Sequence, residues 1–363
     1  MFTPERLVLA RKRRRKTLAA LERESGVSSQ SLTAYENGRK KPTPETLLLI
    51  ATALRFPVSF FAIAAPQELP ADAVSFRAPS KMSASERESA LSAGMMATDL
   101  NRWLESRFRL PAPNIPTLPH LPPEKAAELV RARWGLGEDP SPNMVHLLEA
   151  NGVRVFSLPS DCLDVDAFAT TRPGTPFVFL NTRKTGERGR FDAAHELGHL
   201  VLHCEHRIPR SKETENEAND FASAFLMPRA GLLAQKLYDA PVERILSAKR
   251  RWSVSAMALT LRMHKIGLLS DWRYTQTAKQ LTQMGFRTAE PGSLLARESS
   301  QLLAKVFDAL RAQGMNLTDI ADQLHIPAND LNDHVFGLIP TGLQGGGEQS
   351  PPARPSLRLV DIG

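Results

Sequence analysis

Apolar residues recur every three or four positions along most of the chain, which is the spacing that gathers them on one face of an α-helix. In residues 153–158 apolar and polar side chains alternate instead, and this period of two predicts a β-strand. Residues 166–171 and 177–181 are two further candidate strands, separated by a Pro-Gly turn at 173–174. The predicted helices lie at 4–15, 17–24, 28–35, in two short pieces between 43 and 65, and at 83–109, 123–134, 143–151, 186–204, 214–226, 242–252, 255–264, 298–312, 317–324 and 328–336. We therefore expect a multidomain, mainly α protein with one small sheet.

Changes in periodicity and in proline content divide the chain into five parts. We expect an all-α helix-turn-helix domain at 1–66, a helical connector with a proline-rich spacer at 67–120, and an α+β domain at 121–275. A C-terminal helical region should follow at 276–341, and the tail at 342–363, rich in Gly, Gln, Pro and Ser, is expected to be disordered. The first part is assigned from its order of short helix, glycine turn and short helix.

The basic charge of the chain is concentrated in the first part. The net charge is +7, and residues 1–66 hold 12 Lys and Arg against 5 Glu, while the rest of the chain holds 34 basic and 34 acidic residues. This distribution is the electrostatic footprint of a nucleic-acid binder. The two cysteines form no Cys-x-x-Cys pair, and the apolar run at 47–65 is interrupted by Arg55 and Pro57. We therefore expect a cytoplasmic, nucleoid-associated protein without a membrane span.

Four short motifs in the first part are typical of one DNA-binding family. They are Leu-Ala-x-x-Glu at 18–22, Gly-Val-Ser at 26–28, Leu-x-x-Tyr-Glu-Asn-Gly at 32–38 and Lys-Pro at 41–42. With them the chain resembles the phage-repressor-like (Xre family) helix-turn-helix domains. The resemblance implies that the helix at 28–35 enters the major groove of a double-stranded DNA operator, and that the protein is a homodimer if that operator is palindromic.

The same resemblance assigns DNA contacts residue by residue. Gln30 can bond bidentately to adenine, whereas basic side chains meet phosphates and set affinity rather than sequence. The expected contacts are Ser28, Ser29, Gln30, Thr33 and Ala34 on the helix in the groove, with Asn37, Arg39, Lys40, Arg13 and Arg14 around it. The alternative is that this domain docks another protein, as some members of the fold do.

An apolar helix in the third part carries the pattern His-Glu-x-x-His. Side chains four residues apart share a helix face, so His195 and His199 can point at one metal ion. Glu196 lies on the same turn, where it can act as a general base. Polar groups in a core need partners, and a cation would supply them here. His203, one turn further on, is more simply a packed or hydrogen-bonded histidine than the ligand of a second metal.

A catalytic zinc ion is typically held by three protein ligands and keeps one open coordination position. The extension His-x-x-Gly-x-x-His fails, because Leu202 and Glu205 stand where Gly and His are needed. A glutamate from a later helix is the alternative. Glu215 can face the metal, and Asn219, one turn on, can accept a hydrogen bond from the first histidine. Glu217 is the main rival for this ligand.

The sequence His-Glu-Leu-Gly-His at 195–199, followed by Glu-x-Glu-Ala-Asn-x-Phe-Ala-x-x-Phe-Leu-Met-Pro at 215–228, resembles the ImmA/IrrE family of bacterial metallopeptidases. The resemblance implies a zincin-like domain with one Zn²⁺ per chain, held by the two histidines and Glu215, with Glu196 as the catalytic base. Better-known members of that family relieve repression by cutting a transcriptional repressor.

Together the two resemblances predict a DNA-binding transcriptional regulator with a zinc-dependent endopeptidase domain. Its expected substrate is a repressor or antitoxin-like partner, or the protein itself, in a stress response. The alternative is a DNA-binding repressor or antitoxin whose metal domain senses or binds a partner with little proteolysis. A weaker third hypothesis is a transcription factor that binds a metabolite. The strand at 177–180, if it is a sheet edge, would align an extended peptide by strand addition.

Overall fold

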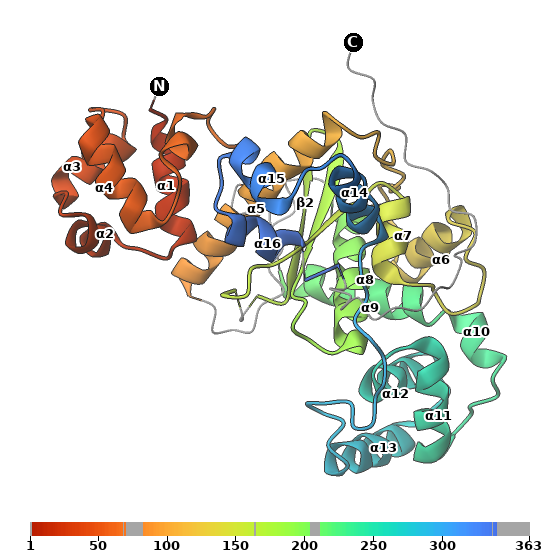
Figure 1. The fold of residues 1–363 in the computed structure, drawn as a ribbon. Helices are drawn as coiled ribbons and strands as arrows, with labels where there is room; N and C mark the ends of the chain where they lie inside the picture. The colour runs from red at the N-terminus through yellow and green to blue at the C-terminus, as the bar shows by residue number, and fades with distance from the viewer. Residues whose placement is uncertain are drawn as a thin grey trace. The chain divides into compact units, whose positions relative to one another are not determined.

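The computed structural model describes residues 2–67, 69, 83–162, 165–203, 211–335 and 337–339, and Figure 1 shows how their elements follow one another. The chain forms two compact units. Unit 1 comprises Met1–Leu110, Phe156–Asp166 and Gln301–Gly363, and unit 2 comprises Pro111–Val155 and Ala167–Ser300. The tail predicted at 342–363 lies outside the described residues. The division of the sequence into five parts stays a prediction.

Unit 1 is built mainly from helices whose starts are set by capping side chains. Thr17, Ser28 and Thr43 each accept a backbone N–H at the start of a helix, as the sequence predicts. Gly26 turns the chain between two of these helices with a φ of 71°, a conformation that glycine adopts without strain. The helices are α1 (Pro4–Arg13), α2 (Leu18–Ser25), α3 (Ser29–Glu36), α4 (Pro44–Leu54), a 3₁₀ turn (Val58–Ala62), α5 (Ala84–Glu105), α14 (Gln301–Ala312), α15 (Leu317–Leu324) and α16 (Ala328–Val335).

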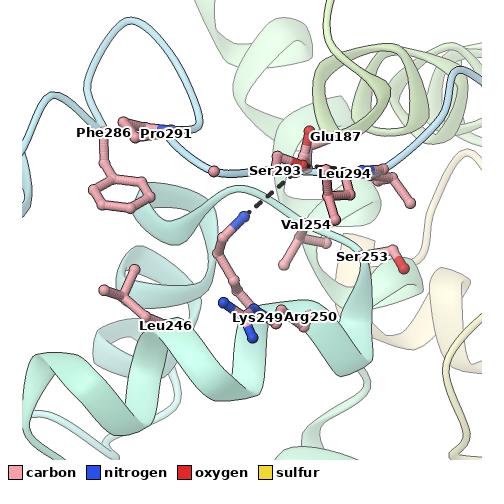
Figure 2. Close-up of a pocket in the computed structure, with 12 residues that line it drawn as sticks. Glu187, Leu246, Lys249, Arg250, Ser253, Val254, Phe286, Pro291, Ser293 and Leu294 are labelled. Atoms are coloured by element: carbon pink, nitrogen blue, oxygen red, sulfur yellow. Dashed lines mark hydrogen bonds and ion pairs between the residues drawn. The ribbon is translucent and has the colours of Figure 1, made fainter.

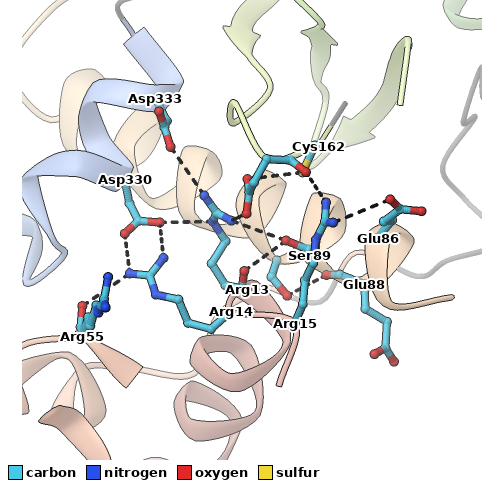
Figure 3. Close-up of polar contacts among 12 residues, drawn as sticks. Arg13, Arg14, Arg15, Arg55, Glu86, Glu88, Ser89, Cys162, Asp330 and Asp333 are labelled. Atoms are coloured by element: carbon cyan, nitrogen blue, oxygen red, sulfur yellow. Dashed lines mark hydrogen bonds and ion pairs between the residues drawn. The ribbon is translucent and has the colours of Figure 1, made fainter. Parts of the chain in front are cut away.

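A buried ion-pair cluster around Arg13 joins distant stretches of unit 1 (Figure 3). The side chain of Arg13 is 3% exposed, and its guanidinium nitrogens lie 2.8 Å from Asp161, 3.1 Å from Asp330 and 3.6 Å from Asp333. Arg14 lies 2.6 Å from the same Asp330. Burial alone would lower the pKa of Arg13, but Asp330 and Asp161 raise it. The end of α1 is therefore held by acidic groups from the 156–166 segment and from α16.

Unit 2 contains the strands and the helices that carry the predicted metal motif. Its elements are α6 (Pro123–Arg133), α7 (Met144–Ala150), β1 (Arg154–Ser157, of which the first two residues belong to this unit), β2 (Ala167–Arg172), β3 (Thr175–Leu180), α8 (Gly186–Leu202), α9 (Lys212–Leu226), α10 (Arg229–Leu233), α11 (Val242–Trp252), α12 (Ala256–Lys265) and α13 (Asp271–Gln283). Two of these helices, α10 and α13, were not predicted. Helix α13 has a mostly polar sequence, and only Thr277 and Leu281 within it are buried.

The three strands lie in the order β1-β3-β2. Strands β2 and β3 pair antiparallel with Ala167 opposite Leu180, and Gly174 makes the hairpin turn with a φ of 79°. Strand β3 is therefore central, so the condition that residues 177–180 form a sheet edge is not met. A period of two shows which side chains share a face but not which neighbours a strand has. Strand β2 is the edge strand on that side and packs on α8.

Helices α8 and α9 approach closely at Gly198. A Cβ built on Gly198 would lie 3.1 Å from the ring of Phe221 and 3.3 Å from the Cα of Ala218, tighter than ordinary van der Waals contact. Beyond this point Phe221 and Phe225 stack with ring centroids 5.8 Å apart. The buried side chain of Arg131 donates a hydrogen bond to the backbone oxygen of Phe225 and so fixes the end of α9. The glycine of the metal motif therefore allows α9 to lie against α8.

The predicted fold class is confirmed, since the described residues form a mainly α, multidomain protein with one three-stranded sheet. The strands predicted at 153–158, 166–171 and 177–181 are each present within about two residues of their expected ends. No helix within the described part of the chain has both the length and the apolar character needed to cross a membrane.

We predict that Asp330→Asn loosens unit 1, because it leaves the buried Arg13 and the partly buried Arg14 without their shared carboxylate. Removing one partner of a buried ion pair costs about 3–5 kcal/mol. Hydrogen exchange followed by mass spectrometry should show lower protection of peptides from α1 and α16. Asp308→Asn is the control, because its pair with Arg311 is 69% and 71% exposed. Equal protection in the two variants would contradict a stabilising role for the cluster.

Candidate functional site

Three potential metal ligands meet where α8 faces α9. The Nε2 atoms of His195 and His199 are 3.1 Å apart, which places them on one side of α8 as their spacing of four predicts. The carboxylate of Glu215 bridges them, with one oxygen 3.3 Å from His195 and the other 3.4 Å from His199. The ligand atoms of these three residues all lie within 4.8 Å of one another.

The outer nitrogen of His195 has a defined partner. The Oδ1 atom of Asn219 lies 3.1 Å from His195 Nδ1. A carbonyl oxygen only accepts hydrogen bonds, so Nδ1 is the protonated nitrogen when this ring is neutral. The lone pair of Nε2 then points toward His199 and Glu215. This is the tautomer that a metal-binding histidine needs, and its partner is the residue that the sequence suggested.

The chemistry of this cluster fits a divalent metal ion. Burial alone would raise the pKa of Glu215, but hydrogen bonding to His195 and His199 lowers it well below its ordinary value. An ionised carboxylate and two imidazole nitrogens at these distances hold together only around a proton or a cation. Among the residues that the structure describes, the cluster offers two imidazole nitrogens and one carboxylate and no fourth side-chain ligand, which is the donor set of a catalytic zinc site. The residues present therefore fit the metal that their pattern suggests.

Glu196 and Glu217 take different places beside this cluster. Glu196 is fully buried on α8, next in sequence to the first ligand. Glu217, the rival for the third ligand, instead lies with its Oε2 atom 2.8 Å from Nε2 of His203. Among the described residues the metal-like cluster contains Glu215 and not Glu217. The structure thus separates two glutamates that the sequence left as alternatives.

The helix expected in the major groove presents a polar surface. Leu32 is fully buried and anchors α3, while Gln30 and Thr33 are exposed. Ser28 caps the helix with its side chain. Arg11 is bonded to Glu36 at the far end of the helix through two hydrogen bonds of 2.6 and 2.9 Å, and this pair fixes α3 on α1. The remaining expected contacts are the half-buried Ser29 and Ala34 and the exposed Asn37, Arg39 and Lys40.

Arg13 and Arg14 do not lie where a phosphate contact needs them. Both guanidinium groups are bound to Asp330, and Arg13 is also bound to Asp161 and almost fully buried. The prediction that they meet the DNA backbone is therefore corrected by the structure. No local pattern could reveal this, since 316 residues separate Arg14 from Asp330. The phosphate contacts expected on this face reduce to Asn37, Arg39 and Lys40.

A cavity of about 550 Å³ lies elsewhere in unit 2 (Figure 2). Its wall includes Lys249, which lies 3.3 Å from Glu187 and 2.8 Å from Glu290. Phe286 and Leu246 supply apolar surface. None of the metal-cluster residues lines this cavity, and its buried ammonium is bound to carboxylates of the same region. It therefore adds no ligand to the candidate metal centre.

Comparison with known families places both sites inside recognised domains. Residues 148–264 match the family described as IrrE N-terminal-like domain, Peptidase_M78. Residues 7–61 match the family described as Helix-turn-helix, HTH_3. No curated protein matches the chain. The metal-like cluster falls within the first match and α3 within the second.

We predict that Glu215→Gln lowers zinc affinity by more than the about 100-fold that loss of an outer partner costs, because it removes a direct ligand. Competition with a chromophoric chelator measures this on the full chain. Glu213→Gln is the matched control, since it removes the same charge from an exposed position of α9. Equal zinc affinities for the two variants would mean that Glu215 is not a ligand.

We predict different effects for two exposed side chains of the DNA-binding face. Gln30→Ala should relax the sequence preference selected from a random duplex pool, because a base-edge contact is worth about 1–3 kcal/mol. Arg39→Ala should weaken binding to all duplexes by the same factor. It should also reduce the slope of log affinity against log salt concentration by about 1. Fluorescence anisotropy across a salt series checks the second effect. Unchanged preference and unchanged slope would show that α3 is not at the DNA.

Proposed function

Because the chain joins a helix-turn-helix domain to a domain of the IrrE N-terminal-like peptidase family, we propose that it is a DNA-binding regulator with a zinc-dependent endopeptidase. The observation that carries the enzymatic part is the convergence of His195, His199 and Glu215 within 4.8 Å. The observation that carries the regulatory part is the exposed polar face of α3 within a domain matched as helix-turn-helix.

The proposed reaction is hydrolysis of a peptide bond. A zinc ion bound to the cluster would supply a water of lowered pKa and polarise the scissile carbonyl. The carboxylate of Glu196 takes a proton from the attacking water and passes it to the nitrogen of the leaving amine. His195, His199 and Glu215 hold the ligand geometry, and Asn219 keeps the first histidine in the right tautomer.

The substrate backbone is proposed to align along β2. This strand has a partner on one side only in the described sheet, and it packs on the helix that carries the two histidines. An extended peptide added there would gain main-chain hydrogen bonds without demanding a particular sequence. The proposal replaces β3, which is central and offers no edge.

The proposed substrate is a repressor or antitoxin-like protein, or the chain itself, cut during a stress response. A DNA-reading domain in the same chain brings the peptidase to the sites where such proteins are bound. This role places the protein in the cytoplasm at the nucleoid, and a homodimer is proposed if the operator is palindromic.

The second candidate function is a DNA-binding repressor or antitoxin whose metal domain binds a partner and cleaves little. One observation favours it. Unit 1 takes in residues 156–166, which comprise the last two residues of β1 and the segment up to β2, so the chain passes from the sheet region into the DNA-binding unit and back. Such an arrangement suits a protein in which partner binding in one region is sensed in the other.

Glu196→Gln separates the two functions. The variant keeps every metal ligand, so it should bind zinc like the wild type, but loss of a general base lowers the rate of cleavage by about 10²–10⁴-fold. His199→Ala should lose both zinc and cleavage. Zinc content is measured on purified protein. Cleavage is measured by comparing the proteomes of cells that express wild type or variant, with and without DNA damage.

A repressor that is shortened or lost only with the wild type would support the peptidase. Identical proteomes, with zinc still bound to both proteins, would support the second candidate function.

A further inference from the structure

We propose that His203 and Glu217 are positioning residues that set the tautomer and orientation of His199. The inference rests on the proposed function, since it concerns the same zinc site. His203 follows the last residue of α8, and Glu217 lies on α9 between the ligand Glu215 and Asn219. Neither residue belongs to the group of potential ligands.

The three side chains form a continuous chain of contacts. Nδ1 of His199 lies 3.0 Å from Nδ1 of His203, and Nε2 of His203 lies 2.8 Å from Oε2 of Glu217. The rings of the two histidines are 5.1 Å apart at 52°. The inner end is buried, with side-chain exposures of 3% for His199 and 9% for His203, while Glu217 at the outer end is 44% exposed.

The direction of these hydrogen bonds follows from the carboxylate. An ionised carboxylate can only accept, so Nε2 of His203 carries the proton that is donated to Glu217. In a neutral His203 the other nitrogen, Nδ1, is then an acceptor. It takes a proton donated by Nδ1 of His199, and a neutral His199 is left with a bare Nε2. That atom is the one that faces His195 and Glu215.

The two histidine ligands therefore have different outer partners. His195 donates to a neutral amide, Asn219, whereas His199 donates to a histidine that is itself bonded to a carboxylate. A carboxylate at the end of a chain of hydrogen bonds makes the imidazole nitrogen a stronger electron-pair donor to a metal ion. The charge of Glu217 therefore acts on zinc affinity through His203 and His199, whereas His195 has no charged outer partner in this chain of contacts.

The pairing arises from the spacing of both helices. His195, His199 and His203 follow one another at intervals of four, so one face of α8 carries all three imidazoles. Helix α9 supplies the acceptors on the other side, and its close approach at Gly198 brings them within reach. The site thus comes from two helices, and its outer contacts add only His203, which directly follows the first of them.

Zinc affinity of the full-length, initially metal-free protein tests the proposal. Glu217→Gln should bind zinc about 10- to 100-fold more weakly than the wild type, the range found when an outer partner of a metal ligand is lost. Glu213→Gln removes the same charge from an exposed position of the same helix and should leave affinity almost unchanged. His203→Phe keeps a ring beside His199 but lacks both nitrogens, and it should match Glu217→Gln.

A second measurement detects the tautomer of His199 directly. Two-bond ¹H–¹⁵N correlation on histidine-labelled, metal-free wild type reports which ring nitrogen is protonated. His199 should carry its proton on Nδ1 in the wild type, and this preference should weaken in Glu217→Gln.

The outcomes separate the two proposals. Wild type that binds no zinc overturns the proposed function. If the wild type binds zinc and Glu217→Gln and Glu213→Gln bind it equally well, the positioning role of His203 and Glu217 is overturned. The proposed peptidase function is not affected by that result. A His199 protonated on Nε2 in metal-free wild type also overturns the positioning role.

Discussion

The candidate metal centre depends on the distance between two helices. Gly198 lets α9 lie against α8, and any side chain there would press on Phe221. If α9 moved away from α8, it would carry Glu215 away from the two histidines that its carboxylate now bridges at 3.3 and 3.4 Å. The buried rings of Phe221 and Phe225 resist that shift because a close-packed core has little room to rearrange. The packing of α8 on α9 therefore sets the geometry of the candidate metal centre.

Features set by local spacing could be predicted from the sequence, and features set by distant contacts could not. The helical period and the interval of four place His195 beside His199 without any knowledge of the fold. Choosing Glu215 over Glu217 needed a resemblance, because both stand on one acidic helix. The order of the strands could not be predicted, because it depends on neighbours that periodicity does not encode. The sequence shows that His203 lies four residues after His199, and this spacing places the two rings side by side. It does not show which acceptor on α9 lies opposite His203.

The DNA-binding face and the metal centre obey opposite electrostatic rules. Residues such as Arg39 keep their charge in water, where it attracts a polyanion at long range and is screened by salt. The ligands on α8 are buried, where charge is tolerated only when it is matched atom by atom. Arg13 is a buried, matched charge, although it lies in a basic run that suggests an exposed one. A basic run in a sequence therefore indicates a binding surface only for those members that stay exposed.

The cluster at the end of α1 also sets an order of events during synthesis. Arg13 and Arg14 leave the ribosome early, whereas Asp330 follows 316 residues after Arg14. At about 5–20 residues per second, roughly 15–60 s pass before that carboxylate exists. Throughout this interval Arg13 and Arg14 lack the carboxylate that they share in the finished protein. The end of α1 therefore gains its contacts with α16 only after almost the whole chain has been made.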